Sequence, residues 1–208
     1  ILAAAGDINV YEGSTKADYG IQAAGSGNIL LQSLAGSIGL ESKAALLAQG
    51  GNVSLLANQN IEQKANAHIR AYSGTIDVQA KGGNIVMAAG TVSSTNDGTE
   101  GSGGNIRYHA GADLELSSLD AGVGSVSLNA DGNIIDKGDN NAEVRADGLR
   151  MVARGNIGEP EGTNNGLLEL AVNELAAQSS GSSGIFVTNS QSLSIAEVGT
   201  VTANRVNA

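Results

Sequence analysis

The chain has 208 residues, of which 41% are hydrophobic and 2% aromatic, and its formal net charge at pH 7 is −10. This acidic balance argues against binding to nucleic acid, which requires a basic surface, and against binding to an anionic membrane. The lack of cysteine excludes disulfides, thiol catalysis and cysteine-based metal sites, and no apolar run approaches the roughly 18 residues of a membrane span.

A short motif, Gly-Asn followed by Ile or Val, recurs six times along the chain. Each copy opens a run in which apolar residues alternate with other residues. Near-identical strands that restart at intervals indicate a repeat architecture. The asparagines of the six copies are Asn28, Asn52, Asn84, Asn105, Asn133 and Asn156.

Seven runs share a period of two, which is the pattern of half-buried strands. Their third inward position is nearly always Ala, which predicts a narrow corner of the fold where a large side chain does not fit. Restart spacings of 24, 23, 30, 20, 23 and 19 residues separate the runs. The runs begin at Ile29, Val53, Ile76, Ile106, Val126, Leu149 and Leu168.

Two further sets of apolar positions lie between these runs. The second set includes Ile38, Ile61, Ile85, Leu114, Ile134, Ile157 and Leu175, and the third includes Ile21, Leu47, Ile69, Val92, Val144 and Ile185. Three strands per unit with irregular spacing predict an all-β fold, a right-handed single-stranded parallel β-helix (β-solenoid) of about eight coils with three strands per coil. We expect no helix.

The chain begins with Ile in an apolar run and shows no signal-peptide pattern. Neither end shows the polar cap that solenoids need for solubility. We therefore expect residues 1–208 to form a single β-helix segment, an excerpt of a longer repetitive chain.

The asparagines that open the strands are predicted to stack from coil to coil as a structural ladder. Such a ladder would satisfy polar groups at a buried corner, where each unsatisfied group costs about 1–3 kcal/mol. On the outward side of the first set of strands, Asp77 is predicted to lie beside Arg107, and Arg150 beside Glu169. Opposite charges on neighbouring strands suit such positions. Ordinary solvent-exposed pairs, which contribute little to stability, would give the same sequence pattern.

Two loops offer oxygen ligands for Ca²⁺, one at Asp97 and Glu100 and the other at Asp136 and Asp139. Neither loop matches the spacing of a known calcium motif, so a solvated insertion loop is the favoured interpretation and no cofactor is expected. His68 and His109 each flank an inward position and have no partner in an interpretable motif. We expect both to lie at the surface, and no catalytic residue is predicted.

A glycosylation sequon and a single phenylalanine are two further features of the sequence. The sequon Asn52-Val53-Ser54 would permit glycosylation, but Asn52 is a ladder position and is expected to be buried. Phe186 falls on the outward side by alternation, where it is either a contact residue or local cover for a neighbouring side chain.

The Gly-Asn-Ile strands and their partners that end in Ala resemble the filamentous haemagglutinin family of large bacterial exoproteins. Residues 168–177, 184–187 and 193–195 also look like shaft modules of such proteins. The resemblance implies a long β-helical shaft, a secreted or cell-surface location, and export by the two-partner route. No binding residue of that family maps onto this chain.

The sequence is compatible with three functions. The first is a structural shaft segment of a bacterial adhesin or extracellular filament, which gives rigid reach for adhesion or biofilm contacts and meets a host or neighbouring-cell receptor or glycan. The second is a β-helical polysaccharide-processing enzyme or glycan-binding module. Scattered carboxylates and the lack of Trp argue against that alternative, and we expect no enzyme. The third is end-to-end self-association through open strand edges.

Overall fold

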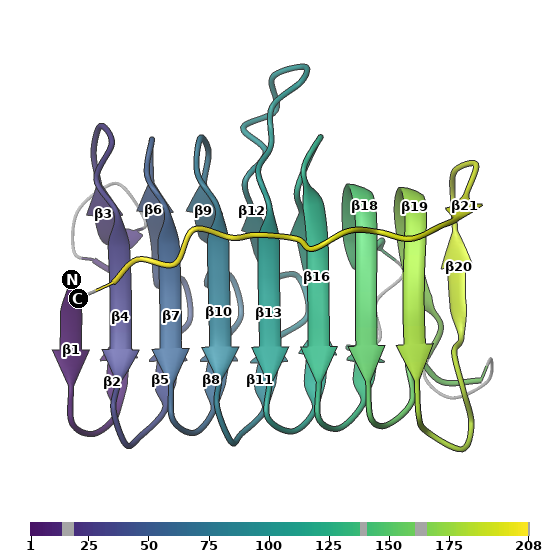
Figure 1. Ribbon diagram of the computed structural model, residues 1–208. Helices are drawn as coiled ribbons and strands as arrows, with labels where there is room; N and C mark the ends of the chain where they lie inside the picture. Colours follow the sequence, from purple (N-terminus) through teal and green to yellow (C-terminus); the bar gives the residue numbers. More distant parts are fainter. Residues whose placement is uncertain (14–18, 138–140, 161–165, 208) are drawn as a thin grey trace.

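The computed structural model describes residues 1–13, 19–137, 141–160 and 166–207. Within these ranges the chain is all-β and contains no helix, and its strands wind into a parallel β-solenoid (Figure 1). The predicted fold class is confirmed.

Each turn contributes strands to three faces. The first face contains β1 (Leu2–Ala4), β4 (Ile29–Ser33), β7 (Val53–Ala57), β10 (Ile76–Ala80), β13 (Ile106–Ala110) and β16 (Ser125–Ala130). The second face contains β2 (Ile8–Val10), β5 (Ile38–Leu40), β8 (Ile61–Gln63), β11 (Ile85–Met87), β14 (Leu114–Leu116) and β17 (Ile134–Asp136). The third face contains β3 (Tyr19–Ala23), β6 (Ala45–Ala48), β9 (Ile69–Ala71), β12 (Val92–Ser94) and β15 (Ser118–Asp120).

Two long strands join the first and third faces into one 15-stranded sheet, whereas the second face remains a separate 6-stranded sheet. The first half of β18 (Val144–Ala153) pairs with β15 and its second half with β16, so β18 spans a corner. β19 (Leu168–Ser179) follows β18 along this path and pairs with β20 (Val187–Asn189) and β21 (Ser194–Ile195). In the described residues, the first face therefore runs from β1 to β19, with the short β21 beside β19, and spans about seven turns.

The winding is right-handed, as the orientation of the first face shows. In Figure 1 the C-terminal segment lies across the first face on the viewer's side, so this face is in front. Its strands run downward while successive turns advance from left to right, and the chain returns behind them. A right-twisted strand favours this hand of connection between parallel strands.

The interior is filled by columns of aliphatic side chains, one layer per turn. On the first face, one inward column comprises Ile29, Val53, Ile76, Ile106, Val126 and Leu149, all at most 4% exposed. The third inward position holds Ser33 and then Ala57, Ala80, Ala110, Ala130 and Ala153, and all of these are buried. Small side chains therefore occupy the place where the chain turns towards the second face.

The third face differs by one residue from the expected alternation at two strands. Leu46, and not Leu47, joins the core, because Leu46 pairs with inward Ile69. Ser93, and not Val92, is the inward residue of β12. A polar network explains the second difference, since the Ser93 hydroxyl lies 2.7 Å from the Tyr108 hydroxyl, which in turn donates to Gln63 Oε1 at 3.1 Å.

The last turns also depart from the expected register. Leu170 lies beside Val144 on the third face, and Leu175 lies beside Leu149 on the first face. The run beginning at Leu168 is therefore not a strand of the first face, and Arg150 neighbours Ala176 instead of Glu169. β19 runs across the corner without a break, and its alternation shifts by one residue there, where Asn173 and Glu174 are both exposed.

Candidate functional site

The six motif asparagines form two columns in place of the single ladder expected. Asn28, Asn52 and Asn105 precede strands of the first face, whereas Asn84, Asn133 and Asn156 precede positions of the second face. All six side chains are half-buried or exposed. The corners are therefore partly open to solvent, which corrects the expectation that Asn52 and its counterparts are buried.

In both columns a side-chain oxygen accepts a backbone N–H from the next turn. Asn28 Oδ1 accepts from Asn52 N at 2.7 Å, and Asn52 Oδ1 accepts from Thr75 N at 2.9 Å. The second column also uses other residues at the same level, and its acceptors are Asp7, Ser37, Asn60, Asn84, Asp113, Asn133 and Asn156. Direct amide contact is the exception, as in Asn52 Nδ2 to Asn28 Oδ1 at 3.2 Å.

The glycine that precedes each asparagine leaves space for this stacking. A Cβ at Gly51 would collide with the carbonyl oxygen of Gly27 one turn below. A Cβ at Gly155 would collide with Asn133 Oδ1, the atom that accepts the hydrogen bond from Asn156 N. The two residues of the Gly-Asn pair therefore act together. Glycine allows the turns to approach closely, and asparagine links them by hydrogen bonds.

A second feature, with no repeat pattern to reveal it, is the C-terminal segment, residues 196–207. It runs back along the solenoid across the outward side of the first face, from the last turns towards the N-terminus (Figure 1). Its residues bond to three successive turns, those of β13, β10 and β7. Thr202 O accepts from Asn105 Nδ2, Asn204 N donates to Thr75 Oγ1, Arg205 bonds to Asp77 and Gln79, and Val206 N donates to Ser54 Oγ.

The cover provided by this segment explains polar burial on the outward side. Ser54 and Asp77 are both 0% exposed, although alternation places them outside the core. Asp77 Oδ1 lies 2.7 Å from Arg107 Nη2, which confirms that pair, and Asp77 Oδ2 lies 2.6 Å from Arg205 Nε. Two arginines thus neutralise one buried carboxylate, and only the first could be found from the repeat.

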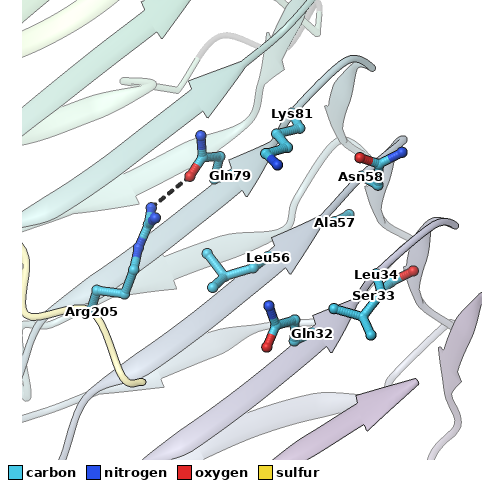
Figure 2. Close-up of a pocket in the computed structure, with 9 residues that line it drawn as sticks. All are labelled: Gln32, Ser33, Leu34, Leu56, Ala57, Asn58, Gln79, Lys81 and Arg205. Atoms are coloured by element: carbon cyan, nitrogen blue, oxygen red, sulfur yellow. Dashed lines mark hydrogen bonds between the residues drawn. The ribbon is translucent and has the colours of Figure 1, made fainter. Parts of the chain in front are cut away.

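A shallow pocket of about 270 Å³ lies beside Arg205 (Figure 2). Figure 2 shows Arg205 reaching Gln79, with 2.7 Å between Nη2 and Oε1, while Lys81 lies on the other side of Gln79. The other lining residues are Gln32, Ser33, Leu34, Leu56, Ala57 and Asn58. No carboxylate lines this pocket, so it does not offer the pair of carboxylates that glycoside hydrolysis uses.

A third feature is the carboxylate cluster, formed by Asp136, Glu143 and Glu169. Each residue offers one carboxylate oxygen, and these oxygens all lie within 4.8 Å of one another. Burial, together with the side chain of Glu169 and the charges of Asp136 and Glu169, raises the pKa of Glu143 to about 9, although the Glu169 N–H opposes the rise. The sequence pattern points to Asp136 as a candidate ligand, but it places Glu169 beside Arg150 and gives no sign of Glu143. Asp139 lies outside the described residues.

The other predicted positions do not assemble into a site in the described residues. Asp97 and Glu100 are exposed on the loop between β12 and β13, and Asp97 Oδ1 accepts from Thr99 N at 2.8 Å. Neither belongs to a cluster of three possible metal ligands.

His68 is half-buried and not fully at the surface, and its Nδ1 accepts from Val92 N at 3.1 Å. Burial lowers the pKa of His68 and of the half-buried His109. Phe186 is half-buried in the last turns.

No family model, curated protein or solved structure matches this chain. In the described residues, no helix suited to crossing a membrane is found. The fold and its contacts are therefore the basis for assigning a function.

Proposed function

We propose that this chain is a structural shaft segment of a secreted or cell-surface bacterial adhesin or extracellular filament, similar to the filamentous haemagglutinin family. Its work would be mechanical, since the shaft gives rigid reach for adhesion or biofilm contacts. In this proposal the chain is not an enzyme, and any receptor or glycan is a partner of the assembled surface protein.

The observation that carries the proposal is that turns are bonded to one another on all three faces and at the corners between them. Parallel ladders run through the two sheets, and side-chain acceptors continue the bonding where the chain leaves a strand. Among the described residues, four ion pairs also connect consecutive turns, joining Glu41 to Lys64, Asp77 to Arg107, Glu115 to Lys137 and Asp131 to Arg154. A rod bonded in this way resists bending and sliding of its turns.

The acidic surface and the apolar ends fit the same proposal. A net charge of −10 keeps a long rod soluble. At the first turn Ile1 and Leu2 are 74% and 48% exposed, and at the last turns Ile195 is 77% exposed. Such exposed apolar residues suit contact with a second copy of the chain stacked end to end.

A pulling experiment tests the mechanical role. The chain has no cysteine, so Leu34→Cys near the first turn and Leu193→Cys near the last provide unique attachment points for an optical trap. We expect a rod that holds its length and then yields in steps of about 80 Å, the length of roughly 24 extended residues. Smooth extension at low force, as for a flexible tether, would contradict a shaft.

Location and activity need separate tests. Antibody labelling of intact cells of the source bacterium is expected to decorate the surface, and label confined to the cytoplasm would refute that part of the proposal. A screen of uronate-containing and neutral glycans is expected to give no cleavage. Turnover that survives purification would instead favour the polysaccharide-processing alternative.

A further inference from the structure

The carboxylate cluster brings together residues from three separate places in the chain. Asp136 ends β17 on the second face, Glu143 immediately precedes β18, and Glu169 is the second residue of β19. Glu143 N donates to Glu169 O at 2.8 Å, so the two glutamates occupy adjacent turns of one ladder. The solenoid itself therefore fixes the spacing of these carboxylates.

The sign of the charges makes this cluster unusual. The four ion pairs that link consecutive turns each join an acid to a base, as in Asp77 with Arg107. At Glu143 and Glu169 an acid is stacked on an acid instead, which is unfavourable in neighbouring strands. No lysine or arginine of the described residues forms an ion pair with Glu143. Glu143 therefore meets an acid in the next turn, where the other linked turns place a base.

Glu143 supplies the observation that points to a ligand. Its side chain is 0% exposed. Its Oε2 accepts from Glu169 N at 2.6 Å, whereas its Oε1 is fully buried and has no hydrogen-bond partner in the described residues. Glu143 also offers one carboxylate oxygen to the cluster, within 4.8 Å of an oxygen of Asp136 and an oxygen of Glu169. A buried carboxylate oxygen without a donor is costly, and a bound cation removes that cost.

We propose that Asp136, Glu143 and Glu169 bind one hard divalent cation, with Ca²⁺ the best fit. All the donors are oxygens, which suit Ca²⁺ or Mg²⁺ better than zinc or copper. Oxygens within 4.8 Å of one another can share one Ca²⁺ at 2.3–2.6 Å from each. Calcium also tolerates an irregular set of ligands, whereas Mg²⁺ demands near-octahedral geometry. Such an ion would link the second and third faces in the last turns, independently of any role as a shaft.

Calcium titration of the intact chain tests the site. The protein is stripped with EDTA, and CaCl₂ is then added at pH 7.5 while heat uptake and thermal unfolding are followed. We expect one ion per chain and a Tm about 5 °C higher at 5 mM Ca²⁺, from stabilisation by ligand binding in a protein of this size. MgCl₂ at the same concentration is expected to give a smaller shift.

Two matched variants locate the ion. Glu143→Gln keeps the shape of the side chain but removes its charge, and it is expected to weaken Ca²⁺ binding at least about tenfold. Glu100→Gln removes a carboxylate from the exposed 96–103 loop and is expected to leave binding unchanged. If Glu143→Gln does not fold, Glu169→Gln is measured in its place, with the same expected loss.

Every outcome decides the proposal. Loss of binding in Glu143→Gln or Glu169→Gln, with retention in Glu100→Gln, supports it. A Tm that does not respond to 5 mM Ca²⁺ would overturn it and would show that protons alone neutralise the cluster. Unchanged binding in the cluster variants would also overturn it, because the ion would then lie elsewhere. Stronger binding of Mg²⁺ than of Ca²⁺ would reject calcium as the ion.

Discussion

Arg205 Nε lies 2.6 Å from Asp77 Oδ2, although 128 residues separate the two in the chain. This bond fastens the C-terminal segment to the middle of the first face. Because Asp77 is fully buried, the bond should contribute more than an exposed ion pair does. Arg107 remains beside Asp77 when Arg205 is removed. We expect Arg205→Ala to lower the free energy of unfolding by about 1–3 kcal/mol, as measured by urea titration.

The matched control is Arg154→Ala. Arg154 is 77% exposed in its pair with Asp131, and its loss should cost under about 1 kcal/mol. Equal effects of the two variants would show that the C-terminal segment does not shield Asp77 from water.

The glycine of the repeat motif gives a second prediction. Gly51→Ala would place a methyl group against the backbone carbonyl of Gly27, which cannot move without parting two turns. We expect a loss of about 1–3 kcal/mol in unfolding free energy. Gly6→Ala has no atom within 4 Å of the added carbon, so it should change stability by less than about 1 kcal/mol. Similar stabilities for both variants in chemical denaturation would argue against close stacking at the corner.

The second column of side-chain acceptors can be tested at Asn133. Its Oδ1 accepts from Asn156 N at 2.8 Å, and its Nδ2 donates to Asp113 Oδ1 at 3.1 Å. Asn133→Ala should cost about 1 kcal/mol through the lost bonds. Asn133→Asp keeps an acceptor but places a second carboxylate beside Asp113, so it should cost more at low salt and recover in part in 1 M NaCl.

Asn129→Ala is the control for these variants, since the Asn129 side chain makes no hydrogen bond with the described residues. It should leave the urea midpoint unchanged. If Asn129→Ala lost as much unfolding free energy as Asn133→Ala, the hydrogen bonds at the corner would not explain the effect of Asn133→Ala.

The histidines predict how stability depends on pH. His68 Nδ1 accepts from Val92 N, and burial lowers the pKa of His68 below its usual value near 6.5. The unfolded chain therefore binds a proton at higher pH than the folded chain, so stability falls as the pH drops below about 6.5. His109 acts in the same direction. His68→Gln should show a smaller fall between pH 7.5 and 5.5, and an identical fall would exclude His68 as a contributor.

Much of the solenoid could be predicted because the repeat is local. Period-two alternation and Gly-Asn motifs mark the strands of the first two faces, and the pairing of Asp77 with Arg107 follows from their shared position in consecutive repeats. On the third face, the sequence does not determine which residues point inward. Leu46 and Leu47 are equally apolar, and inward Ser93 is explained only by its contact with Tyr108.

The candidate sites were harder to predict because they depend on contacts between distant residues. Nothing in residues 196–207 repeats, so their path across the first face has no signal in the pattern. Leu30 gives one hint of a covering segment, because it is an outward-facing leucine. In the folded chain it is only 1% exposed. The carboxylate cluster cannot be predicted from the repeat, because the repeat places Glu169 on the first face, whereas the structure places it beside Glu143 at the start of the third face.

The stacking of turns is tested most directly by cross-linking introduced cysteines. Glu62 and Val86 lie side by side on the outward side of the second face, and adjacent strands about 4.8 Å apart are within reach of a disulfide. The chain has no other cysteine, so mild oxidation of Glu62→Cys/Val86→Cys should close one bond rapidly in the folded protein. Glu62→Cys/Ile135→Cys, three strands apart at about 14 Å, should remain reduced. Equal oxidation of the two pairs, or none in the first, would contradict the solenoid.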